Sequence, residues 1–429
     1  MKAKQALLFA ILASALALGL ANAILLPGQG GDLIVSDMQG YDRAALALWH
    51  QEPLAVHTVE RYIFHPLGSD TYHPPGYYYF LTGIYALAGH SYLAVRMAQA
   101  VLGVLTCWLI YRIGLTVFGT AVGLLAAASA ALYPPLIFYS GVLLTETLGT
   151  CLLSAATFSL LGASRSTDRC RIAQIVLTGV LLGLAGLTRS VLLSAVPFAL
   201  LWLWLVAQPR PSPKRIARDA IALLLPIVLV IAPITARNYQ IHHKFVLIST
   251  NGGVNFFLGH GGSERKKNEV RNIPATYTQG QLVGISSRTA PAEEAYFYQL
   301  GWEYIRTHPL RTLRSIPGRL RDMYWSIDYW PATDLQARFL RSLDQYVWKA
   351  IILLACLGLV LLRKEQRPGA ALLWGMLSSS LSVPLVFWVQ TRFRIPFVPF
   401  FVILAAAGAI EAGRRLRRRV SLATQRIAP

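Results

Sequence analysis

Long apolar runs recur from one end of the chain to the other, and several reach the eighteen or more residues that cross about 30 Å of hydrocarbon. The pattern predicts membrane spans at residues 6–26, 92–113, 120–135, 144–163, 172–188, 191–207, 217–235, 347–362, 370–388 and 396–411. The first run follows Lys2 and Lys4 and is long for a signal peptide, so we interpret it as an uncleaved helix. The sequence thus predicts an all-α polytopic membrane protein of about ten spans.

Two longer polar segments separate these runs, at residues 27–91 and 236–346. In the first, apolar residues recur at helical spacing at Tyr41, Ala44, Ala45, Leu48 and Trp49. This spacing predicts an amphipathic helix that lies on the membrane surface. In the second segment, the pattern predicts a helix from about Pro291 to Arg306.

The stretch from Gly76 to Ala88 is apolar and aromatic but only about thirteen residues long. As a helix it would cover about 20 Å, which is too short for a span. Interfacial tyrosines such as Tyr77, Tyr78 and Tyr79 favour a short helix that dips into the outer interface.

The distribution of basic residues predicts the orientation of the chain in the membrane. The formal net charge is +20, yet only 14% of residues are charged and 55% are hydrophobic. Many basic residues stand in short loops and in the tail after the last run, as cytoplasmic anchors do, so a nucleic-acid partner is not expected. If Gly76 to Ala88 does not cross, all the basic loops and both termini face the cytoplasm, and residues 27–91 and 236–346 lie outside.

We therefore predict three parts. Residues 1–235 form an N-terminal transmembrane module with a first outer loop at 27–91, residues 236–346 form an extracytoplasmic region, and residues 347–429 form C-terminal spans with a basic tail. The predicted location is the bacterial inner membrane.

Acidic residues at the outer membrane face are the first candidates for chemistry. Glu146 begins the fourth span, where it is either an interfacial carboxylate in contact with water or the lining of an active cavity. Asp37 precedes the amphipathic helix, so it is either an N-cap or a general base that takes a proton from an acceptor hydroxyl. Asp42, on another face of the same helix, is the rival base.

Four arginines oppose the positive-inside bias: Arg189, Arg237, Arg392 and Arg394. Each taken alone fits snorkelling to lipid headgroups. Their convergence from different spans would instead form a phosphate pocket, because guanidinium binds phosphate in a bidentate manner.

His73 stands before Pro74 and Pro75, which stiffen the entry to the short interfacial helix. It is either a hydrogen-bonded loop residue or a contact to phosphate. No closed metal-ligand spacing occurs, although Asp37, His73 and Glu146 could meet and share a divalent ion. Tyr72 and Arg96 are secondary candidates, with Asp42.

Taken in order, these residues and motifs resemble the GT-C superfamily, in its branch of protein O-mannosyltransferases and the lipid A aminoarabinose transferase. The motifs are Asp37 with Tyr41, Tyr72-His73-Pro74-Pro75-Gly76-Tyr77, Tyr133-Pro134 followed by Thr145-Glu146, Leu187-Thr188-Arg189, Arg237-Asn238-Tyr239, Asn251-Gly252-Gly253-Val254-Asn255 and Arg392-Phe393-Arg394-Ile395-Pro396. The resemblance extends over nearly the whole chain.

The resemblance implies a polyprenyl-phosphate sugar donor, a lipid, glycan or protein acceptor, an active site at the outer face and inversion at the anomeric carbon. It implies Asp37 as the catalytic base and Glu146 as the second acidic residue. The aminoarabinose branch has an acidic residue followed by Lys before the two prolines, whereas this chain has Tyr72 and His73. That departure leaves His73 as a contact to the donor phosphate.

A transporter or lipid flippase that uses the same charges is the alternative. Transporters commonly show repeated halves and a site at the middle of the membrane. This sequence has neither feature, and its candidate residues gather at one face, which favours the glycosyltransferase.

Overall fold

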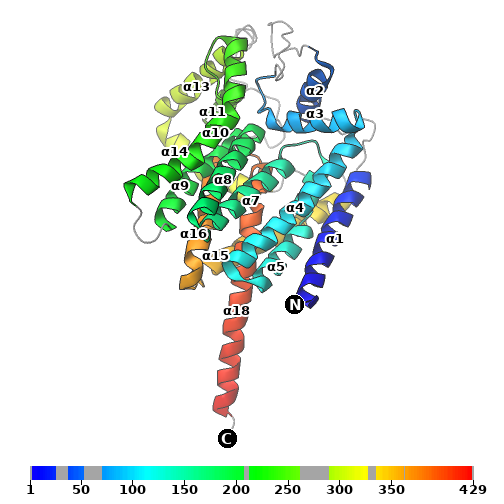
Figure 1. Cartoon of the computed structure of the whole chain (residues 1–429), viewed down its shortest axis with the longest axis vertical. Helices are drawn as coiled ribbons and strands as arrows, with labels where there is room; N and C mark the ends of the chain where they lie inside the picture. Colours follow the sequence, from blue (N-terminus) through cyan, green and yellow to red (C-terminus); the bar gives the residue numbers. More distant parts are fainter. Residues whose placement is uncertain are drawn as a thin grey trace.

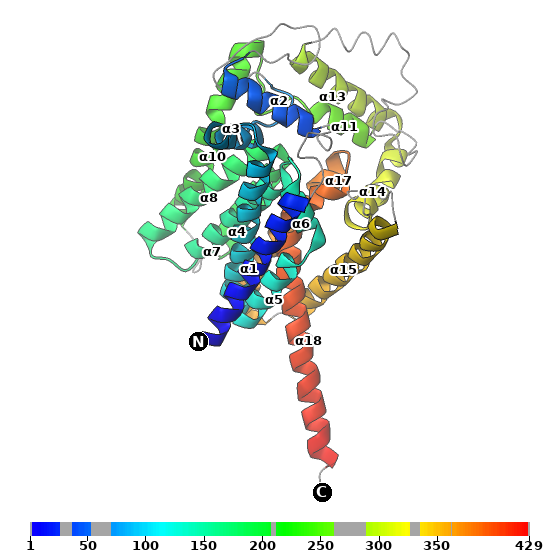
Figure 2. The same ribbon diagram turned by 90° about the vertical axis from the view of Figure 1, so that its right-hand side faces the viewer.

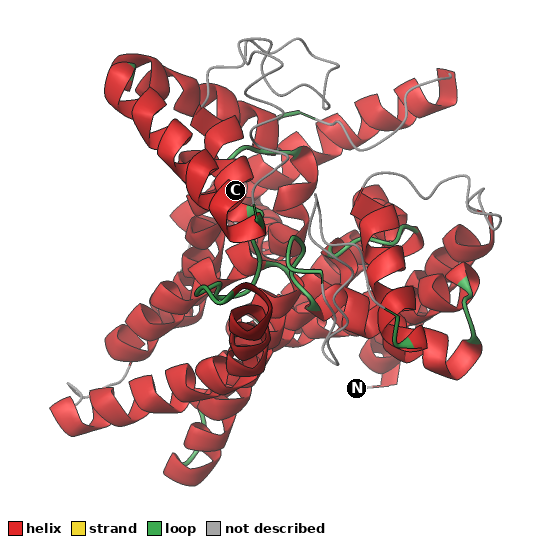
Figure 3. Ribbon diagram, turned by 90° about the horizontal axis from the view of Figure 1, so that it is seen from above, coloured by secondary structure: helices red, strands yellow, loops and turns green. Residues whose placement is uncertain are grey.

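The computed structural model describes residues 2–25, 37–52, 70–206, 212–260, 289–326, 335–361 and 363–427, without the side chains of residues 335–343 and 422–427. Within these ranges the chain forms only helices and connecting loops (Figure 3).

The long helices are α1 (Lys2–Leu25), α4 (Tyr92–Phe118), α7 (Glu146–Ala163), α8 (Asp168–Thr188), α10 (Pro213–His242), α15 (Leu335–Val360) and α18 (Val398–Ile427). Shorter ones are α2 (Asp37–His50), α3 (Gly76–Ala88), α5 (Thr120–Ala131), α6 (Pro134–Gly141), α9 (Ala195–Val206), α11 (Gly252–His260), α13 (Ala290–Thr307), α14 (Pro309–Tyr324), α16 (Arg367–Ser380) and α17 (Ser382–Val386). Three 3₁₀ segments complete the order: η1 (Ser190–Ser194), η2 (Lys364–Gln366) and η3 (Thr391–Phe397).

Each predicted span lies on helical chain. In the described ranges, seven helices are long and apolar enough to cross a membrane, and the pair α5 and α6, bent by 52°, makes an eighth if the two helices count as one broken span. The other two predicted spans lie on the shorter apolar helix Ser190–Leu205 and on α15. The chain is an integral membrane protein with an all-helical fold, as predicted.

Glycine allows the spans to pack closely. A Cβ atom at Gly123 of α5 would lie 2.6 Å from the backbone oxygen of Tyr111 in α4, and one at Gly408 of α18 would lie 2.1 Å from that of Leu354 in α15. Small residues at such crossings let the helices approach where lipid gives no hydrophobic drive for association. These crossings fix the bundle that carries the site.

The helices outside the bundle gather at one end. Figures 1 and 2 show α2, α3, α11 and α13 at the upper end, while both termini lie at the lower end and α18 extends beyond the other helices. In Figure 1, α3 runs across the direction of the long helices. The helices predicted around Tyr41, over Gly76–Ala88 and from about Pro291 to Arg306 are thus confirmed, as α2, α3 and α13.

Candidate active site

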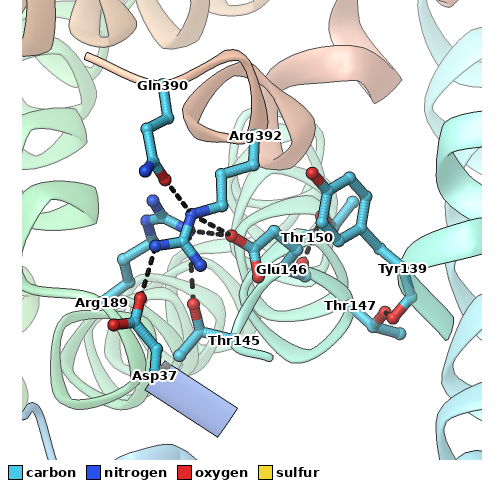
Figure 4. A network of polar contacts seen from close by, with 9 residues as sticks. All are labelled: Asp37, Tyr139, Thr145, Glu146, Thr147, Thr150, Arg189, Gln390 and Arg392. Atoms are coloured by element: carbon cyan, nitrogen blue, oxygen red, sulfur yellow. Dashed lines mark hydrogen bonds and ion pairs between the residues drawn. The ribbon is translucent and has the colours of Figure 1, made fainter. Parts of the chain in front are cut away.

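Two acidic and two basic side chains from four separate segments meet in one cluster (Figure 4). Asp37 begins α2 and Glu146 begins α7, while Arg189 follows the last residue of α8 and Arg392 stands in η3. The sequence predicted each of these residues as part of a site, and the fold brings all four together.

Glu146 is the innermost member of this cluster, with no exposed side-chain surface. Its Oε1 accepts a hydrogen bond from Arg189 Nη1 at 2.8 Å and lies 3.8 Å from Arg392 Nε. Arg189 also donates to Thr145 Oγ1 at 3.2 Å. A carboxylate this buried is stable only when paired, and here two guanidinium groups share it.

Asp37 is the outermost member, with 38% of its side chain exposed against 21% for Arg392. Arg392 Nη2 donates to Asp37 Oδ2 and Arg392 Nε to Gln390 Oε1, both at 2.5 Å. Burial is the largest single influence and raises the pKa of Asp37, but Arg392, His73 and Arg189 together outweigh it and lower the pKa of Asp37 below its ordinary 3.8. Asp37 is therefore an ionised, partly open carboxylate at neutral pH.

One aromatic ring lies beside both guanidinium groups. The central carbon of Arg189 is 4.5 Å from the ring centre of Phe393, and that of Arg392 is 5.7 Å from it. The face of an aromatic ring attracts cations. Phe393 and Glu146 thus hold two positive groups close together, an arrangement suited to an anionic ligand.

His73 is held by Asp70, an acidic residue that the sequence patterns did not predict as part of the site. Its Nδ1 lies 2.9 Å from Asp70 Oδ2, and Asp70 Oδ1 accepts from the backbone N–H of Tyr72 at 2.8 Å. The imidazole packs against Tyr41, with ring centres 4.8 Å apart, and against Gly40, where a Cβ would lie 2.7 Å from its Cε1. The i, i+3 spacing of Asp70 and His73 was the available signal.

A pH dependence follows from this pair. Burial alone would lower the pKa of His73, but Asp70 raises it above the ordinary 6.5. The charged pair therefore stabilises the fold fully below pH 6.5, and this contribution is lost as the pH rises through the raised pKa. As the pH rises above 6.5, we expect the melting temperature in detergent to fall more for the wild type than for His73→Gln. Equal pH profiles for the two proteins would contradict the charged pair.

Arg237 does not join this cluster, contrary to the expectation that four arginines converge. Its guanidinium donates to the Tyr78 hydroxyl at 2.6 Å, to the Asp70 backbone oxygen at 3.1 Å and to Asn238 Oδ1. Because α10 places it beneath the loop that carries His73, Arg237 supports that loop from below.

Arg394 does not join the cluster either. It is fully buried, donates to the backbone oxygens of Met323 and Ser326 at 3.2 and 3.0 Å, and stacks 4.5 Å from the ring centre of Trp348. Arg394 is two residues from Arg392, but the 3₁₀ turn of η3 directs the two side chains to different partners.

The secondary candidates differ in their surroundings. Asp42 is buried and accepts from Tyr85 at 2.6 Å and Tyr92 at 2.9 Å, with His90 Nε2 at 3.0 Å, so it anchors α2 to α3 and α4. Tyr72 lies edge-on to His73 at 5.0 Å between ring centres. Arg96 is buried within α4.

Asp37, His73 and Glu146 do not meet as a metal-binding set. No group of three or more His, Cys, Asp and Glu side chains suited to a metal ion occurs in the described part of the chain. Each of the three side chains has another partner: Arg392 and Arg189 pair with the two carboxylates, and Asp70 pairs with the imidazole.

Tight packing beneath the site holds its segments in place. A Cβ at Gly76, the first residue of α3, would lie 2.7 Å from the backbone nitrogen of Thr188, next to Arg189. Tyr77 donates to Gln99 at 2.8 Å, and Gln99 donates to the backbone oxygens of Ser140 and Val142, just before Glu146. The loop of His73 and the two ends that carry Arg189 and Glu146 are thus fixed to one another.

Residues 72–236 match the family model of dolichyl-phosphate-mannose-protein mannosyltransferases. The oligosaccharyltransferase AglB of Archaeoglobus fulgidus, with an inhibitory peptide and a dolichol-phosphate, aligns with a TM-score of 0.58 and 15% identity over 97% of this chain and 52% of AglB. The chain has the fold of the GT-C superfamily. The fold that the GT-C resemblance implied is thereby confirmed.

Two further solved structures are similar. The A. fulgidus oligosaccharyltransferase with zinc and sulfate aligns with a TM-score of 0.56 and 16% identity, over 97% of this chain and 50% of that one. ArnT from Cupriavidus metallidurans bound to undecaprenyl phosphate aligns with a TM-score of 0.44 and 15% identity, over 94% and 77%. The chain spans about half the length of the A. fulgidus enzymes. A comparison with curated protein sequences finds no match.

Proposed function

We propose that the chain is an inverting glycosyltransferase that moves a sugar from a polyprenyl-phosphate donor to a hydroxyl group of an acceptor. The observation that carries the proposal is the pair of Asp37 and Arg392, a partly exposed carboxylate beside two guanidinium groups at one end of the bundle. The AglB structure with dolichol-phosphate supports a donor of this class, because AglB shares the fold.

In the proposed reaction, the acceptor oxygen attacks the anomeric carbon of the sugar as the bond from that carbon to the phosphate oxygen breaks. The hydroxyl proton passes to the carboxylate of Asp37, which acts as a general base. The electron pair of the broken bond stays on the departing polyprenyl phosphate. Direct displacement inverts the anomeric centre.

Arg189 and Arg392 are the residues proposed to stabilise the negative charge that grows on the phosphate, since charge-assisted hydrogen bonds are strong in a partly buried site. Arg392 would then serve both the base and the leaving group. A bound phosphate competes with Asp37 for Arg392, which leaves the carboxylate freer to accept a proton. His73 lies beside Tyr41 and is the further contact proposed for the phosphate.

The direct test is turnover. The purified full chain is incubated with labelled polyprenyl-phosphate sugars and with lipid, glycan and peptide acceptors. Transfer of label with inversion supports the proposal, and release of polyprenyl phosphate shows which bond broke. Donor movement across a vesicle membrane without bond cleavage would instead favour a flippase.

We further propose that the site faces away from the cytoplasm of a bacterial inner membrane. The test uses a variant with Cys170 and Cys356 replaced by serine. A new cysteine is placed at Ser263, which lies outside the described residues, or at the exposed Thr307. Either cysteine should react with a membrane-impermeant thiol reagent in cells whose outer barrier is permeabilised and whose inner membrane is intact. A cysteine at Ser212, in the loop before α10, should not. The opposite pattern would invert the topology.

A further inference from the structure

Helix α14 (Pro309–Tyr324) has one face that is buried in the protein and another that is apolar but exposed. One face is buried, with Thr312 and Met323 turned toward the protein. On the other, Leu310 and Leu313 are 66% and 61% exposed, and Pro317 is exposed in line with them. Spacings of three and four residues put these three on one side of the helix.

Arginines border this exposed apolar side. Arg311, Arg314 and Arg321 are all exposed, and the one acidic residue of the helix, Asp322, lies 3.5 Å from Arg321. A helix with an apolar stripe, a basic border and low overall hydrophobicity is the kind that lies in a membrane interface. Trp325, directly after α14 and 45% exposed, is a residue type favoured there.

The position of α14 fits an interface. Met323 packs with Val383 of α17 and with Val389, which comes just before η3. Arg394 of η3 donates to the backbone oxygens of Met323 and Ser326, at the end of α14. Figure 2 shows α14 beside α17, on the side of the bundle toward α11 and α13. The helix therefore lies toward the end of the bundle that carries α11 and α13.

We propose that α14 lies in the outer membrane interface, with Leu310 and Leu313 among the acyl chains and Arg311, Arg314 and Arg321 bound to anionic phospholipid headgroups. Charge complementarity favours anionic over zwitterionic lipid, since the helix carries three exposed arginines and a single carboxylate. The proposal depends on the topology proposed above but not on glycosyl transfer.

Lipid bound at α14 would also affect the position of Arg392 in the candidate site. Arg394 ties the last turn of α14 to η3, and η3 carries Arg392. A helix fixed in the interface thus holds the segment that presents the guanidinium group to Asp37.

Membrane depth tests the apolar half of the proposal. In the full chain with Cys170 and Cys356 replaced by serine, an environment-sensitive fluorophore is attached to Leu313→Cys and, as the matched control, to Gly318→Cys. A Cβ at Gly318 meets open space, and this position lies well around the helix from Leu313. In phosphatidylcholine–phosphatidylglycerol nanodiscs, acyl-chain spin labels should quench the probe at 313 and leave the probe at 318 largely unquenched. A probe at 313 that stays in water, or one shielded but unquenched because a second copy covers it, would overturn the proposal.

Charge removal tests the other half. Replacing Arg311, Arg314 and Arg321 with glutamine should reduce the preference for phosphatidylglycerol over phosphatidylcholine, read from lipid retained in native mass spectrometry, by roughly fivefold per arginine. The control replaces Arg417, Arg418 and Arg419 of the tail with glutamine and should leave quenching at 313 unchanged. An unchanged lipid preference in the α14 variant would overturn the headgroup assignment. Because neither measurement uses turnover, an inactive chain would still give an answer.

Discussion

Replacing Asp37 with asparagine should abolish measurable sugar transfer while the chain stays folded and still binds the donor. The amide keeps the size of the side chain but does not accept the hydroxyl proton, and a general base contributes roughly 10²- to 10⁴-fold to rate. The fold should tolerate the change, because Asp37 is 38% exposed and an ion pair of this kind contributes only about 0–1 kcal/mol. The measurement is turnover beside donor affinity and melting temperature in the same detergent.

Asp42→Asn is the matched control, because it makes the same change on the same helix. We expect it to be milder in turnover. Asp42 accepts from the hydroxyls of Tyr85 and Tyr92, and an asparagine offers one acceptor oxygen in place of two. The expected loss is in stability, by about 1–3 kcal/mol for the group left unsatisfied. If Asp42→Asn removed turnover and Asp37→Asn did not, the assignment of the base would be wrong.

Sequence patterns predicted the helices that carry the site better than the contacts within it. The apolar spacing around Tyr41 predicted α2, and the length of Gly76–Ala88 predicted a helix too short to span. Helical periodicity and run length are local properties, so they survive without knowledge of the tertiary fold. Run length did not predict the bend of 52° between α5 and α6, which divides the predicted span at residues 120–135.

The arginines show where the sequence stops being sufficient. Their positions at the ends of apolar runs predicted that all four lie at one end of the bundle, but did not predict the direction in which each side chain points. Arg189 and Arg392 point to Glu146, whereas Arg237 points to Tyr78 and Arg394 to the end of α14. Side-chain direction depends on the rotation of each helix against its neighbours, which sequence spacing alone does not determine.

Asp70 and α14 were missed for different reasons. Asp70 stands in a polar loop where an acidic residue is ordinary, and its i, i+3 spacing to His73 is a weak signal without the contact itself. Helix α14 lies within a polar segment, and its four arginines lower its mean hydropathy, which conceals the stripe of Leu310 and Leu313. A search for apolar runs finds spans and passes over helices that lie in the interface.

Replacing Arg392 with alanine should cause the largest loss of donor affinity of any single arginine variant. Arg392 contacts Asp37, Gln390 and Glu146, so its guanidinium lies between the outer and inner carboxylates of the site. Removing one partner of a desolvated charge pair costs about 2–5 kcal/mol. Affinity for the donor, measured in nanodiscs, should fall by an amount in this range, while affinity for the acceptor changes less. Arg189→Ala should act in the same direction.

Two further variants separate a phosphate contact from a structural role. Arg392→Lys keeps the charge but not the planar fork, so it should recover only part of the donor affinity. Arg237→Ala should weaken donor binding mainly by loosening the loop of Asp70 and His73, and it should therefore lower the melting temperature as well. Arg392 is 21% exposed and lies at the open side of the cluster, so its loss should change the melting temperature less than the loss of the buried Arg237. Unchanged donor affinity in both the Arg189 and Arg392 variants would remove the phosphate pocket and leave these arginines as structural partners of Glu146.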